Sequence, residues 1–317
     1  MQILREADGI TPVDTPSAVT IGVFDGVHVG HQALISELAQ QSKSEGLVPT
    51  VVTFDQHPAR IVRPETAPRL LCDLEQRIEL LGQAGAERVY VVQFDEQRAR
   101  ETAEEFVEST LVRNLRSSRV IVGKDFHFGA GRKGDVALLT ELGDANGFET
   151  IGTTLVHDPN KGDIISSTRI RDALIRGDVA EAESLLGRPH EVRGIVEDGD
   201  KRGRTLGFPT ANVTVPEEIL LPADGVYAGT YLRPDGTAHR TAVSIGRRPT
   251  FYAERGALLV EAHLLDFDDD LYGEVGAVQV HAWIRGQIRF PDADALIEQL
   301  HADIADCRRL LDRRSRS

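Results

Sequence analysis

Short apolar runs alternate with amphipathic segments through the first half of the chain. The apolar runs have the length of buried strands, and the segments between them carry apolar residues at helical spacing. Predicted strands cover 18–24, 49–54, 88–94, 119–122 and 150–156. Predicted helices cover 32–42, 74–84, 103–115 and 136–146. Because short apolar strands that alternate with helices form parallel sheets, this half predicts an α/β domain with helices on both faces of its sheet.

Two local signals mark helix ends in this half. Thr102 followed by Glu105 is a capping-box pattern at the start of the third helix. After Ser166 the pattern predicts two short helices, which end where Gly187 is followed by Pro189, because glycine and proline stop helices.

The pattern changes from Val192 onward, where β-type runs follow one another without helices between them. These runs cover 192–196, 211–215, 226–232, 241–245, 258–265 and 278–284. Such strands predict an antiparallel barrel or a sandwich. A final amphipathic helix is predicted over 293–311. Its core-facing residues are expected to be Leu296, Ile297, Leu300, Ile304 and Leu310. We therefore predict two domains, 1–186 and 187–317.

Length and composition agree with a globular protein of two domains. The 317 residues are 41% hydrophobic and 27% charged, which is ordinary for globular chains. No apolar run approaches the roughly 20 residues that span a bilayer, and the first residues lack the apolar core of a signal peptide. We therefore expect a cytoplasmic protein that does not bind membranes. Its cysteines, Cys72 and Cys307, are expected to be free thiols.

The net charge restricts the class of partner. The formal charge is −14 at neutral pH, which disfavours nucleic acid because phosphate backbones are held by basic surfaces. Small anionic ligands need only local positive groups, so they remain compatible with this charge.

The most informative motif is the glycine-rich segment 22–31, which contains His28 and His31. It follows a predicted strand and precedes a predicted helix. Glycines let the backbone approach a ligand closely, and a helix N-terminus attracts anions. A lone histidine is more often structural, but two histidines at such a turn favour phosphate chemistry. Zinc is the alternative use of paired histidines, and it would need further ligands that the spacing does not supply.

The His-x-Gly-His pattern resembles the signature of the nucleotidylyltransferase superfamily. The resemblance implies that both imidazoles stabilise charge on the α-phosphate during in-line attack, without a covalent intermediate. Physical chemistry agrees, because this transfer needs positioning and charge stabilisation more than a nucleophilic side chain.

A second motif, 165–171, contains Ser167, Thr168 and Arg169. Taken alone it predicts an ordinary capped helix. Beside the first motif it resembles the superfamily's second phosphate clamp, in which hydroxyl and helix N–H groups bind triphosphate oxygens and arginine neutralises charge.

The third motif, 203–212, is a loop rich in glycine that leads into a strand. By itself it is compatible with a well-formed turn. Thr210 and Asn212 alternate along the strand start, so their side chains are expected on one face. Two oxygen ligands on one face suit a Mg²⁺ ion that keeps waters and nucleotide phosphates.

With these motifs together, the whole chain resembles the bacterial bifunctional riboflavin kinase/FAD synthetase family. The stretches that carry the resemblance follow the family order and span almost the whole length. They are 22–31, 53–58, 122–129, 166–171, 203–212, 225–228, 245–251 and 260–267.

The resemblance implies a Rossmann-like nucleotidylyltransferase domain with a parallel sheet, then an antiparallel riboflavin kinase-like barrel with a terminal helix. The barrel would make FMN and ADP from riboflavin and ATP. The first domain would make FAD and pyrophosphate from FMN and ATP. Mg²⁺ is the implied metal and ATP the co-substrate.

The resemblance also assigns roles to residues. His28, His31 and Glu261 would be catalytic, with Glu261 as the base, although alone it reads as a surface carboxylate. Thr210 and Asn212 would hold the metal–nucleotide. The implied binding residues are Gly22, Phe24, Asp25, Gly26, Gly30, His57, Asp125, Ser167, Thr168, Arg169, Gly203, Arg204, Gly207 and Pro209.

The chain departs from the family pattern at two places. His127 stands where the family often has arginine, and a neutral histidine is the weaker phosphate partner. Arg247 and Arg248 stand where threonine and asparagine are common. The core of both signatures is intact, so we expect both activities.

Two other functions stay open at this stage. The first domain could adenylylate a different acceptor, with the barrel as a recognition module. Alternatively, the chain could be a flavin-binding or regulatory protein without turnover. Charge-stabilising groups together with a base argue against a pure binder. The sequence does not predict the oligomeric state.

Overall fold

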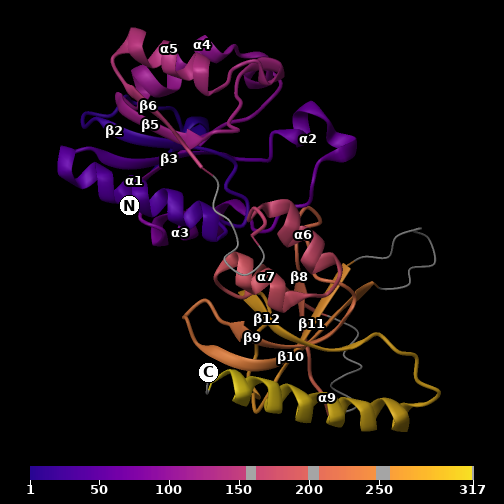
Figure 1. Cartoon of the computed structure of the whole chain (residues 1–317). Helices are drawn as coiled ribbons and strands as arrows, with labels where there is room; N and C mark the ends of the chain where they lie inside the picture. The colour runs from indigo at the N-terminus through magenta and orange to yellow at the C-terminus, as the bar shows by residue number, and fades with distance from the viewer. Residues whose placement is uncertain (155–161, 199–206, 248–257, 316–317) are drawn as a thin grey trace. The chain divides into compact units, whose positions relative to one another are not determined.

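The computed structural model describes residues 1–154, 162–198, 207–247 and 258–315. The chain divides into two compact units, Met1–Ser166 and Ser167–Ser317, whose elements are labelled in Figure 1. Each unit is described by itself.

The first unit is built on a parallel sheet of six strands in the order β1-β4-β3-β2-β5-β6. The strands are β1 (Gln2–Arg5), β2 (Ser17–Ile21), β3 (Val48–Phe54), β4 (Arg88–Val92), β5 (Ser117–Gly123) and β6 (Glu149–Thr153). The predicted strands are all present, and β1 is an additional edge strand. The chain order reverses at β2, which pairs with β3 on one side and β5 on the other.

The connecting segments form the helices α1 (Val29–Glu45), α2 (Ala59–Val62), α3 (Leu74–Gln83), α4 (Ala103–Phe106) and α5 (Val136–Asn146). The capping box at the start of α4 is confirmed: the Glu105 amide donates to the Thr102 hydroxyl (3.1 Å) and the Thr102 amide donates to the Glu105 carboxylate (2.8 Å). The predicted single helix over 103–115 is instead one turn of α-helix that continues as a π-helix, Val107–Asn114.

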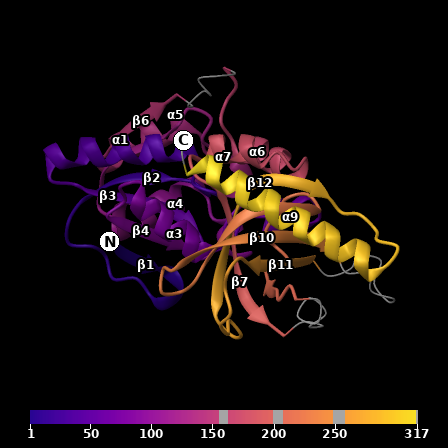
Figure 2. The ribbon, with the colours of Figure 1, turned by 90° about the horizontal axis from the view of Figure 1, so that it is seen from below.

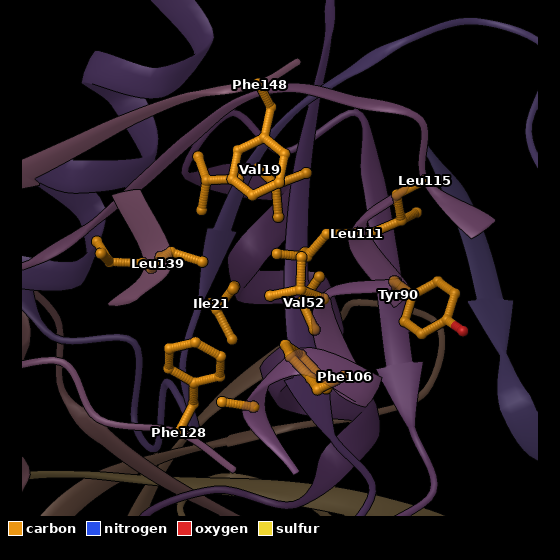
Figure 3. Close-up of a cluster of buried hydrophobic side chains, with 14 of the residues drawn as sticks. Val19, Ile21, Val52, Tyr90, Phe106, Leu111, Leu115, Phe128, Leu139 and Phe148 are labelled. Atoms are coloured by element: carbon orange, nitrogen blue, oxygen red, sulfur yellow. The ribbon is translucent and has the colours of Figure 1, made fainter. Parts of the chain in front are cut away.

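Apolar side chains cover both faces of this sheet, as predicted. On one face the strands pack against α4, the π-helix and α5, through residues that include Phe106, Leu111 and Leu139, and Figure 3 shows this cluster. On the other face Val51, Val89 and Val91 pack against α1 and α3. Burial on both faces explains why these strands are almost continuously apolar.

The second unit contains a closed barrel with the strand order β10-β11-β8-β7-β12-β9, in which neighbouring strands are antiparallel. Its strands are β7 (His190–Glu197), β8 (Ala211–Thr214), β9 (Gly225–Leu232), β10 (Ala238–Arg247), β11 (Leu258–Leu264) and β12 (Val275–Gly286). The strand pattern alone was compatible with a barrel or a sandwich, and the family resemblance predicted a barrel. Closure through the β9–β10 pairing decides for the barrel.

The terminal helix α9 (Ala293–Arg314) packs on the barrel, and Figure 2 shows it lying across β10 and β12. Its most buried residues are Asp303, Cys307 and Leu311. The predicted residues Ile304 and Leu310 also pack there, although they are only partly buried. Asp303 binds Arg285 of β12 through two hydrogen bonds of 2.8 and 2.6 Å. The core-facing side of the helix is therefore partly polar.

Two short helices, α6 (Ser167–Ile175) and α7 (Val179–Leu186), belong to the second unit. As predicted, α7 ends at Gly187, which adopts a left-handed conformation with φ of 73°. The helix buries Val179, Ala182 and Leu185 and contacts β7 and β12. The compact division thus falls 20 residues before the predicted boundary at 186/187.

None of the helices in the described ranges is both long and apolar enough to cross a membrane.

Candidate functional site

The motif with the two histidines forms the turn between β2 and α1 in the first unit. Helix α1 begins at Val29, three residues earlier than predicted, so His28 is its N-cap and His31 lies in its first turn. Because ligands of open parallel sheets bind beyond the carboxyl ends of the strands, where the strand order reverses, this turn occupies the expected binding position.

The backbone of this turn is strained at residues that are not glycine. Phe24 has φ of 51° and Val27 has φ of 38°, a region that β-branched residues rarely adopt. Gly26, with φ of 76°, is the position between them that requires glycine. Strain of this kind persists only where surrounding contacts impose it, and it concentrates at functional sites.

Buried and partly buried hydrogen bonds hold this conformation. The Val23 carbonyl accepts from the Thr53 hydroxyl (3.1 Å) and from the Arg77 guanidinium (2.9 Å). The Asp25 carboxylate, itself buried, accepts from the Leu71 amide at 2.8 Å. The Gly26 amide donates to the Cys72 thiol sulfur at 3.3 Å. The turn is therefore held by residues from β3, α3 and the segment before α3.

The two imidazoles are stacked at the helix N-terminus. Their ring centroids are 3.5 Å apart with an interplanar angle of 18°, and Phe24 contacts the His31 ring edge-on at 5.0 Å. The His28 Nδ1 atom accepts from the His31 amide at 3.3 Å, so the proton of neutral His28 is on Nε2. The His31 Nδ1 atom is buried and has no hydrogen-bond partner within the described residues.

Burial, reinforced by the neighbouring His28, lowers the pKa of His31 well below 6.5. His31 is therefore neutral at pH 7 in the protein without ligand. Free helix N–H groups, the partial positive charge of the helix end and imidazole N–H groups together form a site for an anion such as a phosphate group.

The other predicted residues of this unit lie around the same edge. Gly22 allows a close approach, because a Cβ there would meet the Phe24 ring at 3.1 Å, and Gly30 lies in the first turn of α1. His57 follows β3, and its Nδ1 atom accepts from the Ala59 amide at 3.1 Å. Asp125 follows β5 and is exposed. Since β3 and β5 flank β2, these residues share one sheet edge with His28.

His127, which stands where the family often has arginine, has an exposed side chain. Its Nδ1 atom lies 2.8 Å from the Asp125 carbonyl oxygen. Because this carbonyl can only accept, Nδ1 carries the proton in that contact.

The second motif begins α6, within the second unit. Ser167 is half-buried and is the first residue of the helix, and Thr168 is exposed. Arg169 forms an ion pair with Glu181 of α7 at 2.9 Å, and the other carboxylate oxygen of Glu181 pairs with Arg176 at 2.9 Å. The assignment of Ser167, Thr168 and Arg169 as a triphosphate clamp stays a prediction.

In the barrel, the strand register brings two predicted residues together. Glu261 of β11 lies directly opposite Asn212 of β8 and opposite Ser244 of β10. Val260 and Ala262, on either side of Glu261, are buried in the barrel interior, so Glu261 lies on the outer face. Residues directly opposite in antiparallel strands have Cβ atoms about 5 Å apart, so the proposed base and metal ligand are neighbours.

Thr210 immediately precedes β8 and is two residues from Asn212, on the same side of the chain. Gly207 adopts φ of 85°, and the Pro209 carbonyl accepts from His263 Nδ1 at 2.7 Å. Gly203 and Arg204 lie outside the described residues, as does Arg248; Arg247 ends β10.

The described residues contain no group of three or more His, Cys, Asp or Glu side chains that could hold a metal ion. A hydroxyl and an amide oxygen remain as donors at Thr210 and Asn212. Such a sparse set of hard oxygen donors fits Mg²⁺, which keeps several waters and binds through nucleotide phosphates, better than it fits a metal that needs a full protein cage.

Comparison with known proteins decides the family. The family model described as FAD synthetase matches residues 10–169, and the model described as riboflavin kinase matches 186–311. The bifunctional riboflavin kinase/FMN adenylyltransferase of Escherichia coli K12 is 38% identical over 304 residues, which cover 96% of each chain. The protein of the same name from Listeria monocytogenes is 37% identical, over 93% of this chain and 92% of its own. The chain belongs to this bifunctional family.

A solved structure of the same fold supports the arrangement of elements. The crystal structure of a protein named as a macrolide-efflux protein from Streptococcus pneumoniae is 32% identical, covers 97% of this chain and 99% of its own, and aligns with a TM-score of 0.85. The fold predicted from the family resemblance, a parallel α/β domain followed by an antiparallel barrel and a terminal helix, is confirmed.

Sequence patterns did not identify two residues whose side chains bind the backbone near these candidate sites, Arg77 and His263. Arg77 bridges the carbonyls that follow β2 and end β3, at 2.9 and 2.8 Å. An arginine within the apolar face that includes Ile78 and Leu81 was the available signal. His263 follows Glu261 by two residues, so strand alternation could have placed it on the same face.

Proposed function

We propose that this chain makes FMN and then FAD. The second unit phosphorylates riboflavin with ATP and releases ADP, and the first unit transfers AMP from ATP to FMN and releases pyrophosphate. The observation that carries the proposal is the match of two unrelated family models, in tandem, to one chain. For the division of the two activities, 1–186 and 187–317 remain the proposed boundaries, and the cytoplasm is the proposed location.

In adenylyl transfer, we assign charge stabilisation to His28 and His31. A phosphate oxygen of FMN attacks the α-phosphorus of ATP in line, and the bond to the pyrophosphate oxygen breaks. The helix N–H groups and the His28 Nε2–H would donate to the α-phosphate oxygens. Because His31 has lost its solvation, an arriving triphosphate favours its protonated form and places a positive charge where negative charge develops.

The remaining assignments of the first reaction concern binding. Gly22, Phe24, Asp25, Gly26 and Gly30 shape the turn that receives the nucleotide. His57 and Asp125 are assigned to the same carboxyl edge of the sheet. Ser167 and Thr168 are assigned to triphosphate oxygens and Arg169 to charge neutralisation, and its ion pair with Glu181 keeps the guanidinium in a fixed orientation.

In the kinase reaction, we assign the role of base to Glu261. Its carboxylate takes the proton of the riboflavin 5′-hydroxyl as that oxygen attacks the γ-phosphorus of ATP, and ADP leaves. The loop residues Gly203, Arg204, Gly207 and Pro209 are assigned to nucleotide binding.

Thr210 and Asn212 would hold Mg²⁺ together with the nucleotide phosphates. When bound, the ion would neutralise charge on the transferred phosphoryl group. The contribution of the chain is the fixed register that puts Asn212 beside Glu261.

The test is to incubate the purified protein with riboflavin, ATP and Mg²⁺ and to separate the flavins by chromatography. We expect FMN to appear first and FAD to follow. FMN without FAD would exclude the adenylyltransferase half, and a screen of acceptors against labelled ATP would then identify another acceptor. Tight flavin binding without ATP consumption would instead indicate a flavin-binding protein.

A further inference from the structure

We propose that His263 is a positioning residue of the kinase site. Its imidazole fastens the Pro209–Thr210 segment to β11 and thereby fixes the position from which Thr210 reaches the metal–nucleotide. The inference rests on the proposed kinase function, because it assigns a role at that same site.

The backbone pairing of β8 with β11 stops just before this segment. The last paired residues are Ala211 and Ala262. One step further along the register would place Thr210 opposite His263. Pro209 has no N–H group and cannot donate to a ladder. Backbone hydrogen bonds of the sheet therefore do not fix Thr210, the proposed metal ligand, which lies just before the first residue of the short strand β8.

The His263 side chain supplies a connection where the ladder ends. Its Nδ1 atom lies 2.7 Å from the Pro209 carbonyl oxygen. Because a carbonyl oxygen only accepts, Nδ1 must carry the proton. This bond joins β11 to the residue immediately before Thr210.

Aromatic contacts hold the same segment from a second direction. Phe208 is 8% exposed, and its ring makes edge contacts with His263 at 5.8 Å and with His301 of α9 at 5.1 Å. The residue before Pro209 is thus fixed between β11 and α9.

His263 lies on the same strand as Glu261, the proposed base of the kinase reaction. His263 and Glu261 are two residues apart in β11, so both side chains are on the outer face of the barrel. Glu261 is opposite Asn212, and His263 holds the segment of Thr210. One strand therefore carries the proposed base and also sets the spacing of the proposed metal ligands.

The test compares substitutions that keep or move the N–H group. In His263→Asn the amide nitrogen takes the place of Nδ1, whereas in His263→Gln it takes the place of Nε2. FMN formation is measured against MgATP concentration at saturating riboflavin. We expect His263→Gln and His263→Ala to raise the KM for MgATP about tenfold, as loss of one well-placed hydrogen bond predicts. We expect His263→Asn to stay within about twofold of the wild type.

A matched control is His239→Asn, at a half-buried histidine of the barrel whose ring contacts Phe267 at 4.7 Å. It should leave the KM for MgATP unchanged. Conversion of supplied FMN to FAD should be normal in every variant and reports the integrity of the first unit. Equal kinetics of His263→Asn and His263→Gln, whether both normal or both impaired, would overturn the proposal. Absence of FMN formation by the wild type would instead overturn the proposed function.

Discussion

At the scale of single residues, the stacked imidazoles of His28 and His31 constrain each other's charge. Two protonated rings with centroids 3.5 Å apart would repel, and burial already disfavours the charged form of His31. A positive charge on these imidazoles therefore needs a neighbouring negative charge, such as that of a bound phosphate group, to stabilise it. At the site that we propose, this coupling would let a bound triphosphate induce the positive charge, so that the turn is not permanently cationic.

We expect His28→Ala and His31→Ala to reduce the conversion of FMN to FAD about 100- to 1,000-fold, because each would remove a group that we propose stabilises the developing charge. FMN formation from riboflavin by the same protein should be almost unchanged. Both rates are measured by chromatography of the flavins. Equal damage to both reactions would contradict the assignment of these residues to one site.

Glu261→Gln should impair FMN formation and leave FAD formation intact, which is the reverse of the effect expected for the histidine variants. The amide cannot accept the hydroxyl proton, so FMN formation should fall about 100- to 10,000-fold, which is the usual contribution of a general base. FAD formation from supplied FMN should continue. Ser244→Ala, opposite Glu261 on the other side, is the matched control and should reduce FMN formation far less.

His190 should make the barrel sensitive to acid. It is 2% exposed, and burial lowers its pKa from 6.5 to about 4. Between these values the unfolded chain binds the proton and the folded chain does not, so stability falls as the pH falls through this window. At pH 5 the loss due to His190 is about 2 kcal/mol.

The measurement is urea unfolding at pH 7 and pH 5, followed by the fluorescence of the single tryptophan, Trp283, which lies in β12. His190→Gln should lower stability at pH 7 but show a smaller further loss at pH 5 than the wild type. An identical loss in both proteins would contradict the role of His190.

At the scale of elements, the attachment of α9 depends on a buried charge pair. Asp303→Ala would leave Arg285 partly buried without its carboxylate, which typically costs about 3–5 kcal/mol. We expect a loss of this order in the barrel transition reported by Trp283. Asp306→Ala, on the same helix, removes a carboxylate whose pair with Arg309 is about half exposed, and it should cost less than about 1 kcal/mol.

Most elements could be predicted because their apolar pattern is strong, and the errors have local causes. Strand β1 has only four residues and is at most partly buried, at Leu4 and Arg5, so its periodicity carries little signal. Helix α1 starts early because His28 acts as its cap, a use of histidine that capping preferences do not anticipate. Asp303 is a buried polar residue of α9, and a prediction that looks only for apolar residues on a helix face does not find it.

Sequence motifs also predicted the residues of the candidate sites, but not the contacts that hold these residues in place. The register of Glu261 with Asn212 depends on pairing between distant segments. The strain at Phe24 and Val27 is imposed by contacts from β3 and α3, which a local pattern cannot contain. The sequence marks the positions of Arg77 and His263, but it does not show which backbone carbonyls they bind, because any carbonyl can accept.

At the scale of the whole molecule, α6 and α7 decide how the chain can be divided. The apolar face of α7 is buried in the second unit, and Arg314 of α9 pairs with Glu183 of α7. We expect a fragment 167–317 to unfold at a higher temperature than 187–317, because the shorter fragment exposes the strands that α7 covers. Thermal unfolding followed by Trp283 fluorescence measures the difference. Equal midpoints would show that the two helices do not stabilise the barrel.

The pairing of Arg169 with Glu181 should also limit where this chain can be joined to a relative in a chimaera. The FAD synthetase model extends to residue 169, whereas the second compact unit begins at Ser167. A crossover at 166 or at 186 transfers both ion-pair partners together. A crossover between α6 and α7 would separate Arg169 of this chain from its partner Glu181. We therefore expect chimaeras of this chain to be more stable when they keep α6 and α7 together than when the crossover falls between these helices.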